Sequence, residues 1–245
     1  MPSPNNVLTA DSYIQDGLVF QLDGIEYGEI DGQWIDRKGS IAFDISQQAK
    51  MPTFVDFLGN TPSYLLSGIF NFDARNCSVD CIVNITNNNA AKILTGGNDA
   101  NFNLWTENKK VGLATSGSTK LYSVSSYPAT IHLLTEGCIY NGLRKVTYST
   151  DTSGRGNAVA LGGVNNPPTK SFTGSIYAIR IYSRQLSDRE ILINQKIDNA
   201  RFGLGLDIPD EVLPASRSLS LLEPFELPDE SESEQEPTNE TSDER

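Results

Sequence analysis

The residues that could do chemistry gather in one segment, GGNDANFNLW, at positions 96–105. A protein binds a sugar by stacking an aromatic ring on its apolar face and bonding its hydroxyls with fixed polar groups. The candidate ligand-binding residues here are Asn98, Asp99, Asn101 and Trp105, with Asn103 beside them. Because calcium prefers the hard oxygens of Asp and Asn, Asp99 and Asn101 are also candidate calcium ligands. The alternative is structural: the Asn and Asp residues would form a turn, and Trp105 would pack in the core.

A second candidate for ligand binding is Trp34 in GQWIDRKG, positions 32–39, where Asp36 follows two residues later. Turns that lead into strands often have this composition, so a structural role for both residues competes with binding. Calcium is the one cofactor that any of these motifs suggests.

Catalytic motifs are absent from the sequence. The single histidine, His132, lies in ATIHLLT, and no serine occupies the Gly-x-Ser-x-Gly pattern of a nucleophile elbow. Glycoside hydrolysis needs two carboxylates beside the scissile bond, and the chain before its acidic end shows no such cluster. The segments TGGNDAN and LGGVNN lack the Lys and the following helix of a phosphate-binding loop. We therefore predict a protein without enzymatic activity.

Charge is distributed unevenly along this chain, whose formal net charge is -12. Residues 207–245 hold 13 of the 31 acidic and two of the 19 basic residues, so the first 206 residues hold 18 acids and 17 bases. Such a near-neutral body lacks the clustered Lys and Arg that bind nucleic acid or an anionic membrane surface. We see no signal segment and no apolar run near the roughly 20 residues of a membrane span.

The three cysteines, Cys77, Cys81 and Cys138, are an odd number and a poor basis for a disulfide framework. On an extended strand, Cys77 and Cys81 would share a face but lie about 13 Å apart, too far for a disulfide. A metal site would need more Cys or His nearby. We expect buried free thiols.

The elements that must position these residues are mostly short strands. Apolar and β-branched segments recur at intervals of roughly 8–12 residues between Gly, Asn, Asp and Ser clusters, a rhythm typical of an antiparallel sandwich or barrel. CSVDCIVNIT, positions 77–86, alternates with one apolar face and places Ser78 and Asp80 on the other. In CIYNGLRKVTY, the Asn141-Gly142 pair favours a hairpin with a type I′ turn.

One helix is predicted, from about Asp188 to Arg201. Ser187 and Glu190 in SDRE form a capping box before an apolar periodicity of three and four residues. Gly203 is well placed to end the helix in a left-handed conformation.

We divide the chain into a lead-in at 1–15, a β-sandwich at 16–206 and a disordered acidic tail at 207–245. The tail is rich in Pro, Ser and Glu and cannot bury enough apolar surface to become ordered. Within it, LSLLEPFELP at 219–228 is either a solvated linker or a docking motif that orders on a partner.

The segment FTGSIYAIRIYSRQLSDREILINQKI, positions 172–197, resembles the closing strand and helix of the laminin-G-like or concanavalin-A-like jelly-roll superfamily. GLVFQLDG, NCSVDCIVNIT and IYNGLRKVTY resemble further strands of that superfamily, in the right order. The resemblance covers about residues 16–203. It implies an all-β fold: an antiparallel β-sandwich, or jelly roll, with one short C-terminal helix. In related domains, loops at one rim of the sandwich carry calcium or sugar, and some relatives are glycoside hydrolases.

Stand-alone copies of this fold without a signal segment resemble those in phage and prophage virion proteins. The leading expectation is therefore a non-enzymatic binding or structural module of a virion, assembled in the host cytoplasm, for decoration or adhesion to host glycan. Its partners would be other virion proteins, further copies in a homo-oligomer, or a surface glycan, with no nucleic acid and no membrane. The alternatives are a lectin-like carbohydrate-binding domain of a cellular, cytoplasmic protein and a glycoside hydrolase.

Overall fold

The computed structural model describes residues 7–28, 30–39, 41–59, 62–66, 70–73, 76–96, 103–115, 118–134, 137–146, 155–158, 160–163 and 171–214. All of them belong to one compact unit, Met1–Ala215. The predicted docking motif at 219–228 and the rest of the chain from 215 onward lie outside the described residues. Within the described ranges, no helix is long and apolar enough to cross a membrane.

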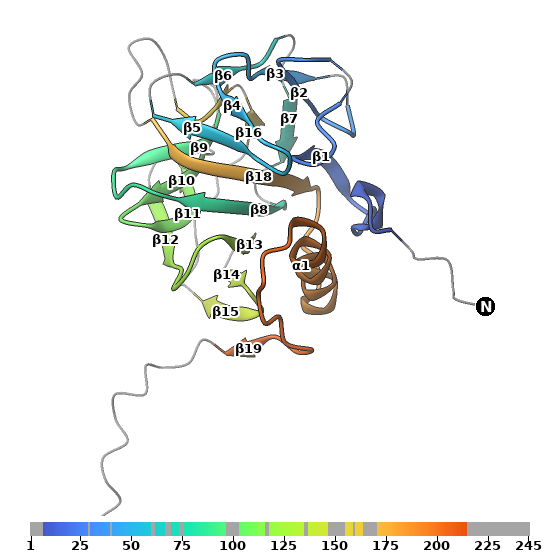
Figure 1. Ribbon diagram of the computed structural model, residues 1–245. Helices are drawn as coiled ribbons and strands as arrows, with labels where there is room; N and C mark the ends of the chain where they lie inside the picture. Colours follow the sequence, from blue (N-terminus) through green and yellow to red (C-terminus); the bar gives the residue numbers. More distant parts are fainter. Residues whose placement is uncertain are drawn as a thin grey trace, which may run out of the picture. The chain divides into compact units, whose positions relative to one another are not determined.

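The larger sheet of the sandwich has nine strands in the order β19-β15-β14-β13-β8-β18-β5-β4, with β1 also paired to β18 (Figure 1). The pairing of β15 with β19 is parallel, and the other pairs in this sheet are antiparallel. Its strands are β1 (Leu18–Asp23), β4 (Ala49–Lys50), β5 (Val55–Leu58), β8 (Ser78–Ile85), β13 (Ala129–Leu134), β14 (Gly137–Tyr140), β15 (Leu143–Val146), β18 (Thr173–Tyr182) and β19 (Leu213–Pro214).

The smaller sheet has six antiparallel strands in the order β12-β11-β10-β9-β17-β6. They are β6 (Ser63–Tyr64), β9 (Ala91–Thr95), β10 (Asn103–Glu107), β11 (Lys110–Thr115), β12 (Ser118–Ser123) and β17 (Ala160–Leu161). Two strand pairs complete the sandwich: β2 (Gln33–Ile35) with β3 (Ala42–Asp44), and β7 (Phe70–Asp73) with β16 (Arg155–Ala158). A short 3-10 helix, η1 (Ala10–Ser12), precedes β1.

The apolar core lies between the two sheets, as the alternating sequence pattern predicts. In β8 the four alternating residues of the predicted apolar face all join this core: Val79, Cys81, Val83 and Ile85. Leu94 of β9 and Leu104 of β10 face them from the smaller sheet and are fully buried. The prediction of an antiparallel β-sandwich is therefore confirmed.

The α-helix α1 (Asp188–Phe202) follows the last long strand, β18, and is the one α-helix among the described residues (Figure 1). The Ser187 hydroxyl accepts a hydrogen bond from the Glu190 backbone N–H, and the Glu190 carboxylate accepts one from the Ser187 N–H at 2.8 Å. Arg184 pairs with Glu190 at 2.6 Å and lowers the pKa of that carboxyl to about 2. Gly203, with φ of 60°, ends the helix in the left-handed region, as predicted.

The predicted hairpin joins β14 to β15. Asn141 and Gly142 both have positive φ, 48° and 78°, which is the signature of the type I′ turn. Gly142 donates its N–H to the side chain of Gln195 of α1 at 2.8 Å, so the turn also fixes the helix to the sheet.

The sandwich unit extends beyond the predicted limits of 16–206 at both ends. Tyr13 is buried, and the Ile14 N–H donates to the side chain of Asn194 at 3.0 Å, so residues before 16 pack on α1. After 206, Lys196 pairs with Asp210 at 2.5 Å, and the Leu213 N–H donates to the Gly142 carbonyl at 3.0 Å. Composition alone placed these boundaries too narrowly, because it does not show that single apolar side chains of the two segments, such as Ile14 and Val212, pack against the unit.

Candidate functional site

Trp105 lies on the face of the smaller sheet that points away from the core. Its neighbours along β10, Leu104 and Thr106, are fully buried, and Leu104 belongs to the core. Because successive side chains of a strand point to opposite faces, Trp105 points to the outer face. Only 8% of Trp105 is exposed, so a ligand would contact the margin of the indole and the side chains around it.

Strand register identifies the neighbours of Trp105 on this outer face. Trp105 pairs with Lys92 of β9 on one side and with Gly112 of β11 on the other. Gly112 in turn pairs with Leu121 of β12. Directly paired residues of one face have Cβ atoms about 4.5–5.5 Å apart, so these side chains form one continuous row.

The next row along the same strands is polar. It consists of Glu107, Lys110 and Ser123, paired directly from β10 to β11 and from β11 to β12. Lys110 and Ser123 are exposed, and Glu107 is half-buried. We call the two rows together the Trp105 face; it combines an indole and a leucine with amine, carboxylate and hydroxyl groups.

Gly112 shapes the Trp105 face because a glycine places no side chain at the centre of that face. A Cβ atom at this position would overlap the backbone oxygen of Lys120. The glycine therefore allows the close approach of β12 to β11, and it leaves no side chain between Trp105 and Leu121.

At the opposite end of this outer face, the side chains at the pairing of β9 with β17 are buried and closed to a ligand. Thr95 of β9 and Ala160 of β17 pair there and are both buried. The Thr95 hydroxyl donates to the Gly163 carbonyl at 2.8 Å. Beyond them Tyr64 of β6 is 42% exposed, an aromatic side chain on this face that the sequence pattern did not single out.

The polar half of the predicted binding segment, Asn98, Asp99 and Asn101, lies outside the described residues. Asn103 is described, and its side-chain oxygen accepts a hydrogen bond from the Gly96 N–H at 3.3 Å, which joins the two ends of that segment. Calcium binding by Asp99 and Asn101 stays a prediction. In the described part of the chain, no group of three or more His, Cys, Asp or Glu side chains could hold a metal.

Trp34, the second candidate, is a core residue. Its ring is fully buried and lies 5.5 Å from the ring of Tyr27, centroid to centroid. The indole N–H donates to the Asp23 carbonyl at 3.0 Å. No face of Trp34 is open to a sugar, so the structural alternative holds at this position. Asp36 likewise holds its turn by accepting from the N–H groups of Gln21 and Lys38.

A buried cluster of charged residues lies between α1 and the outer face of the larger sheet. Arg180 of β18 donates to Asp80 of β8 at 3.2 Å and to Asp198 of α1 at 2.8 Å. The His132 ring contacts the other oxygen of Asp80 through Nδ1. All four residues are buried. Burial acts to raise the pKa of Asp80, but His132 and Arg180 hold it below its usual range.

Neutral groups complete this cluster. The Asn194 amide donates to Asp80 at 3.0 Å and to the Tyr182 hydroxyl at 2.8 Å, and the Thr130 hydroxyl donates to Asp198 at 2.6 Å. The Tyr13 ring covers the guanidinium of Arg180 at 3.9 Å. The cluster is sealed from solvent, so it is suited to fixing α1 on the sheet rather than to binding a substrate.

The three cysteines, all among the described residues, are buried and outside any disulfide, as predicted. Burial raises the pKa of Cys77 and of Cys138 to about 12. Both thiols therefore stay protonated near neutral pH, which makes them poor nucleophiles.

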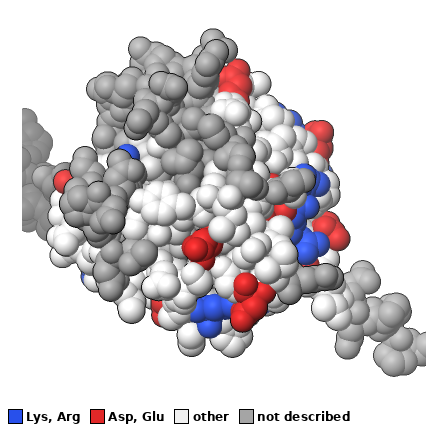
Figure 2. All heavy atoms as spheres, turned by 90° about the horizontal axis from the view of Figure 1, so that it is seen from above, with Lys and Arg blue, Asp and Glu red and all other residues white. Residues whose placement is uncertain are grey.

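Charged side chains of both signs are interspersed on the one face that Figure 2 shows. In the described part of the face shown in Figure 2, Lys and Arg lie beside Asp and Glu, and neither sign forms a broad patch. This mixed surface agrees with the near-neutral composition of the first 206 residues.

No protein-family model and no curated protein sequence matches the chain. Among solved structures, the chain is similar to Trypanosoma rangeli sialidase in complex with sialic acid, with a TM-score of 0.54 and 11% identity over 75% of this chain. It is also similar to the same sialidase in complex with the inhibitor DANA, with a TM-score of 0.52 and 15% identity over 73% of this chain. The match spans only 33% and 32% of those sialidase chains.

A further similar structure is domain 4 of AbnA, a GH43 extracellular arabinanase from Geobacillus stearothermophilus, in complex with arabinotriose. The TM-score is 0.47, with 16% identity over 71% of this chain and 96% of that domain. At the identities found, the likeness to the sialidases shows a shared β-sandwich fold and no more.

Proposed function

We propose that this chain is a non-enzymatic glycan-binding module whose ligand lies on the Trp105 face. The observation that carries the proposal is the strand register, which places Trp105 and Leu121 beside Lys92, Glu107 and Lys110 on one face. The sialidase that shares this fold was solved with sialic acid, which supports a sugar as the class of ligand.

The Trp105 face offers the two kinds of contact that a sugar needs. The margin of the Trp105 indole and the Leu121 side chain provide an apolar surface for the C–H groups of a sugar ring. Lys110 and Lys92 can donate hydrogen bonds to hydroxyl or carboxylate oxygens, and Glu107 can accept them from hydroxyls. The exposed polar row would then orient the ligand, while the apolar row provides contact area.

A binding role suits this face better than glycoside hydrolysis. Glu107 is the one carboxylate in the two described rows, and hydrolysis needs a second one across the scissile bond. Asp80 and Asp198 both accept from Arg180 elsewhere, but both are buried between α1 and the larger sheet.

A glycan array probed with the full chain and its variants tests this proposal. We expect Glu107→Gln and Lys110→Ala to weaken binding to every glycan that the wild-type chain retains, because the first replaces the carboxylate of the Trp105 face by an amide and the second removes its exposed amine. Trp105→Ala should abolish binding, and its folding should be checked by circular dichroism because the residue is mostly buried. The matched control is Tyr64→Ala, an exposed aromatic at the far end of the same outer face, which should leave binding unchanged.

Two outcomes would contradict this site. One is an array on which no glycan is retained by the wild-type chain. The other is binding that Tyr64→Ala abolishes and the substitutions at Glu107 and Lys110 leave intact. The array should be repeated with calcium and with a chelator, since loss of binding on chelation would support Asp99 and Asn101 as calcium ligands.

The wider setting that we propose is a phage or prophage virion, in which the module decorates the particle or adheres to host glycan. Nothing in the fold or its similar structures adds to the sequence argument for this setting, so it stays a prediction. We expect the protein to copurify with particles at a defined stoichiometry. Its recovery only from the soluble cell extract would contradict the virion role and leave glycan binding standing.

A further inference from the structure

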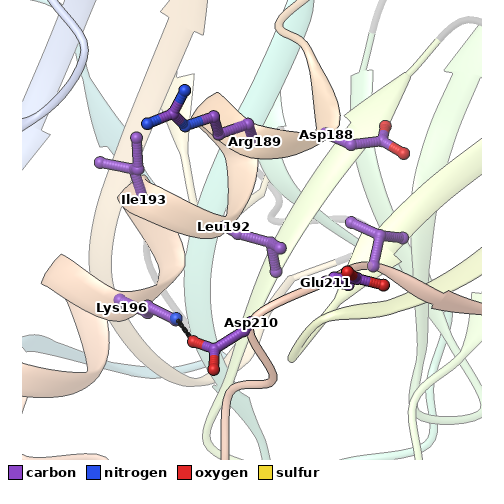
Figure 3. Close-up of a pocket in the computed structure, with 8 residues that line it drawn as sticks. Asp188, Arg189, Leu192, Ile193, Lys196, Asp210 and Glu211 are labelled. Atoms are coloured by element: carbon purple, nitrogen blue, oxygen red, sulfur yellow. Dashed lines mark hydrogen bonds and ion pairs between the residues drawn. The ribbon is translucent and has the colours of Figure 1, made fainter.

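A groove of about 560 Å³ runs between α1 and the segment 210–212, away from the Trp105 face (Figure 3). Leu192 points into it from α1 (Figure 3). Val212, of the segment 210–212, also lines it. Ile193 stands at its rim and is 38% exposed. The groove therefore has an apolar floor and an apolar side chain presented beside it.

Three of the five charged side chains that line this groove are already paired within the chain. Lys196 pairs with Asp210 at 2.5 Å across one end of the groove, as the dashed line in Figure 3 marks. Asp188 contacts Arg144 of β15. Neither pair is available to a partner without loss of an existing contact.

The two remaining charges, Arg189 and Glu211, have opposite signs and lie on opposite walls of the groove. No ion pair within the described part of the chain involves either of them. A surface with an apolar centre and one unpaired charge of each sign on its two walls is complementary to itself under a twofold rotation. Such self-complementarity points to a second copy of the chain as the occupant.

We propose that this groove is the interface of a symmetric homodimer. In the dimer, Ile193 of each copy enters the groove of the other and packs against Leu192 and Val212. Arg189 of one copy pairs with Glu211 of the second copy, and the reverse pair forms across the axis.

The dimer should be weak. A stable interface buries about 800 Å² on each partner, whereas this groove presents a single exposed large apolar side chain, Ile193, to a second copy. Exposed ion pairs contribute at most about 1 kcal/mol each, so the charges set the orientation more than the affinity. We expect association that depends on concentration, with dissociation constants in the micromolar range. This interface is independent of the proposed glycan site.

Sedimentation velocity of the full chain from about 5 to 500 μM tests the proposal. The expected result is a shift from monomer to dimer across this range. Ile193→Lys should leave the chain monomeric at every concentration, because it places a charge in the apolar groove. The matched control is Ile25→Lys, at a residue that is 39% exposed and lies outside this groove, and it should dimerise like the wild type.

Charge reversal provides the specific test of the twofold arrangement. Arg189→Glu and Glu211→Arg should each weaken the dimer at least several-fold, because each places like charges opposite one another. The double variant restores opposite charges and should recover most of the wild-type association. A wild-type chain that stays monomeric at 500 μM overturns the proposal. A dimer that survives Ile193→Lys, or a double variant weaker than both single variants, overturns it too.

Discussion

Arg180→Met should lower the free energy of unfolding by about 3–5 kcal/mol, because it leaves the buried carboxylates of Asp80 and Asp198 without their shared cation. Arg180 is fully buried and donates to both carboxylates, at 3.2 and 2.8 Å. One of these carboxylates belongs to β8 and the other to α1, so the substitution should loosen the helix from the sheet. Urea unfolding followed by circular dichroism measures the change.

The control for this prediction is an ion pair on the surface of the same helix. Lys196 pairs with Asp210, and both side chains are exposed. Lys196→Met should cost less than about 1 kcal/mol, as exposed pairs usually do. If Arg180→Met cost no more than Lys196→Met, the buried cluster would not be what fixes α1 on the sheet.

Trp34→Ala should also cost about 3–5 kcal/mol, the usual range for removing a large aromatic side chain from a core. The ring is fully buried beside Tyr27, and its N–H bond to the Asp23 carbonyl joins β2 to β1. The same urea unfolding experiment measures this loss of stability. Trp34→Phe keeps most of the buried area and should cost less, about 1–2 kcal/mol, for the lost hydrogen bond and the smaller volume.

This prediction separates the structural role of Trp34 from the binding role first considered for it. In buffer without denaturant, the folded Trp34→Phe variant should retain the glycan specificity of the wild type. If the Trp34→Phe variant were folded and had lost glycan binding, Trp34 would be a ligand-binding residue and this prediction would be wrong.

The elements with local sequence signals were predicted well. The capping box at Ser187 and Glu190 and the glycine at 203 located α1 to within a residue at its C-terminal end. The Asn141-Gly142 pair predicted the turn from β14 to β15, because only residues tolerant of positive φ can form it. The helix cap, the helix end and the hairpin turn depend on residues that are close along the chain, so the sequence alone predicts them.

The buried charged cluster could not be predicted in the same way. It joins Asp80, His132, Arg180 and Asp198, which meet only after three strands and the helix are assembled. The pattern did place Asp80 on the face of β8 opposite the core, but it gave no sign of what covers that face. Its burial under α1 depends on long-range packing that strand alternation does not specify.

The two tryptophans show the same limit for the candidate site. Trp34 and Trp105 stand in similar surroundings in the sequence, each near Gly and Asp or Asn residues. Only the position of its neighbour Leu104 in the core shows that Trp105 points away from the core. Alternation within one strand defines two faces, but the packing of the sheets decides which of them is buried.

Tryptophan fluorescence tests the central claim most directly, because the chain has just two tryptophans. In the Trp34→Phe variant, Trp105 is the sole indole, and its emission reports on the Trp105 face alone. Titration with a panel of neutral and sialylated oligosaccharides should produce a saturable change in that emission for at least one class of glycan. A panel in which no glycan changes the Trp105 emission would contradict the account.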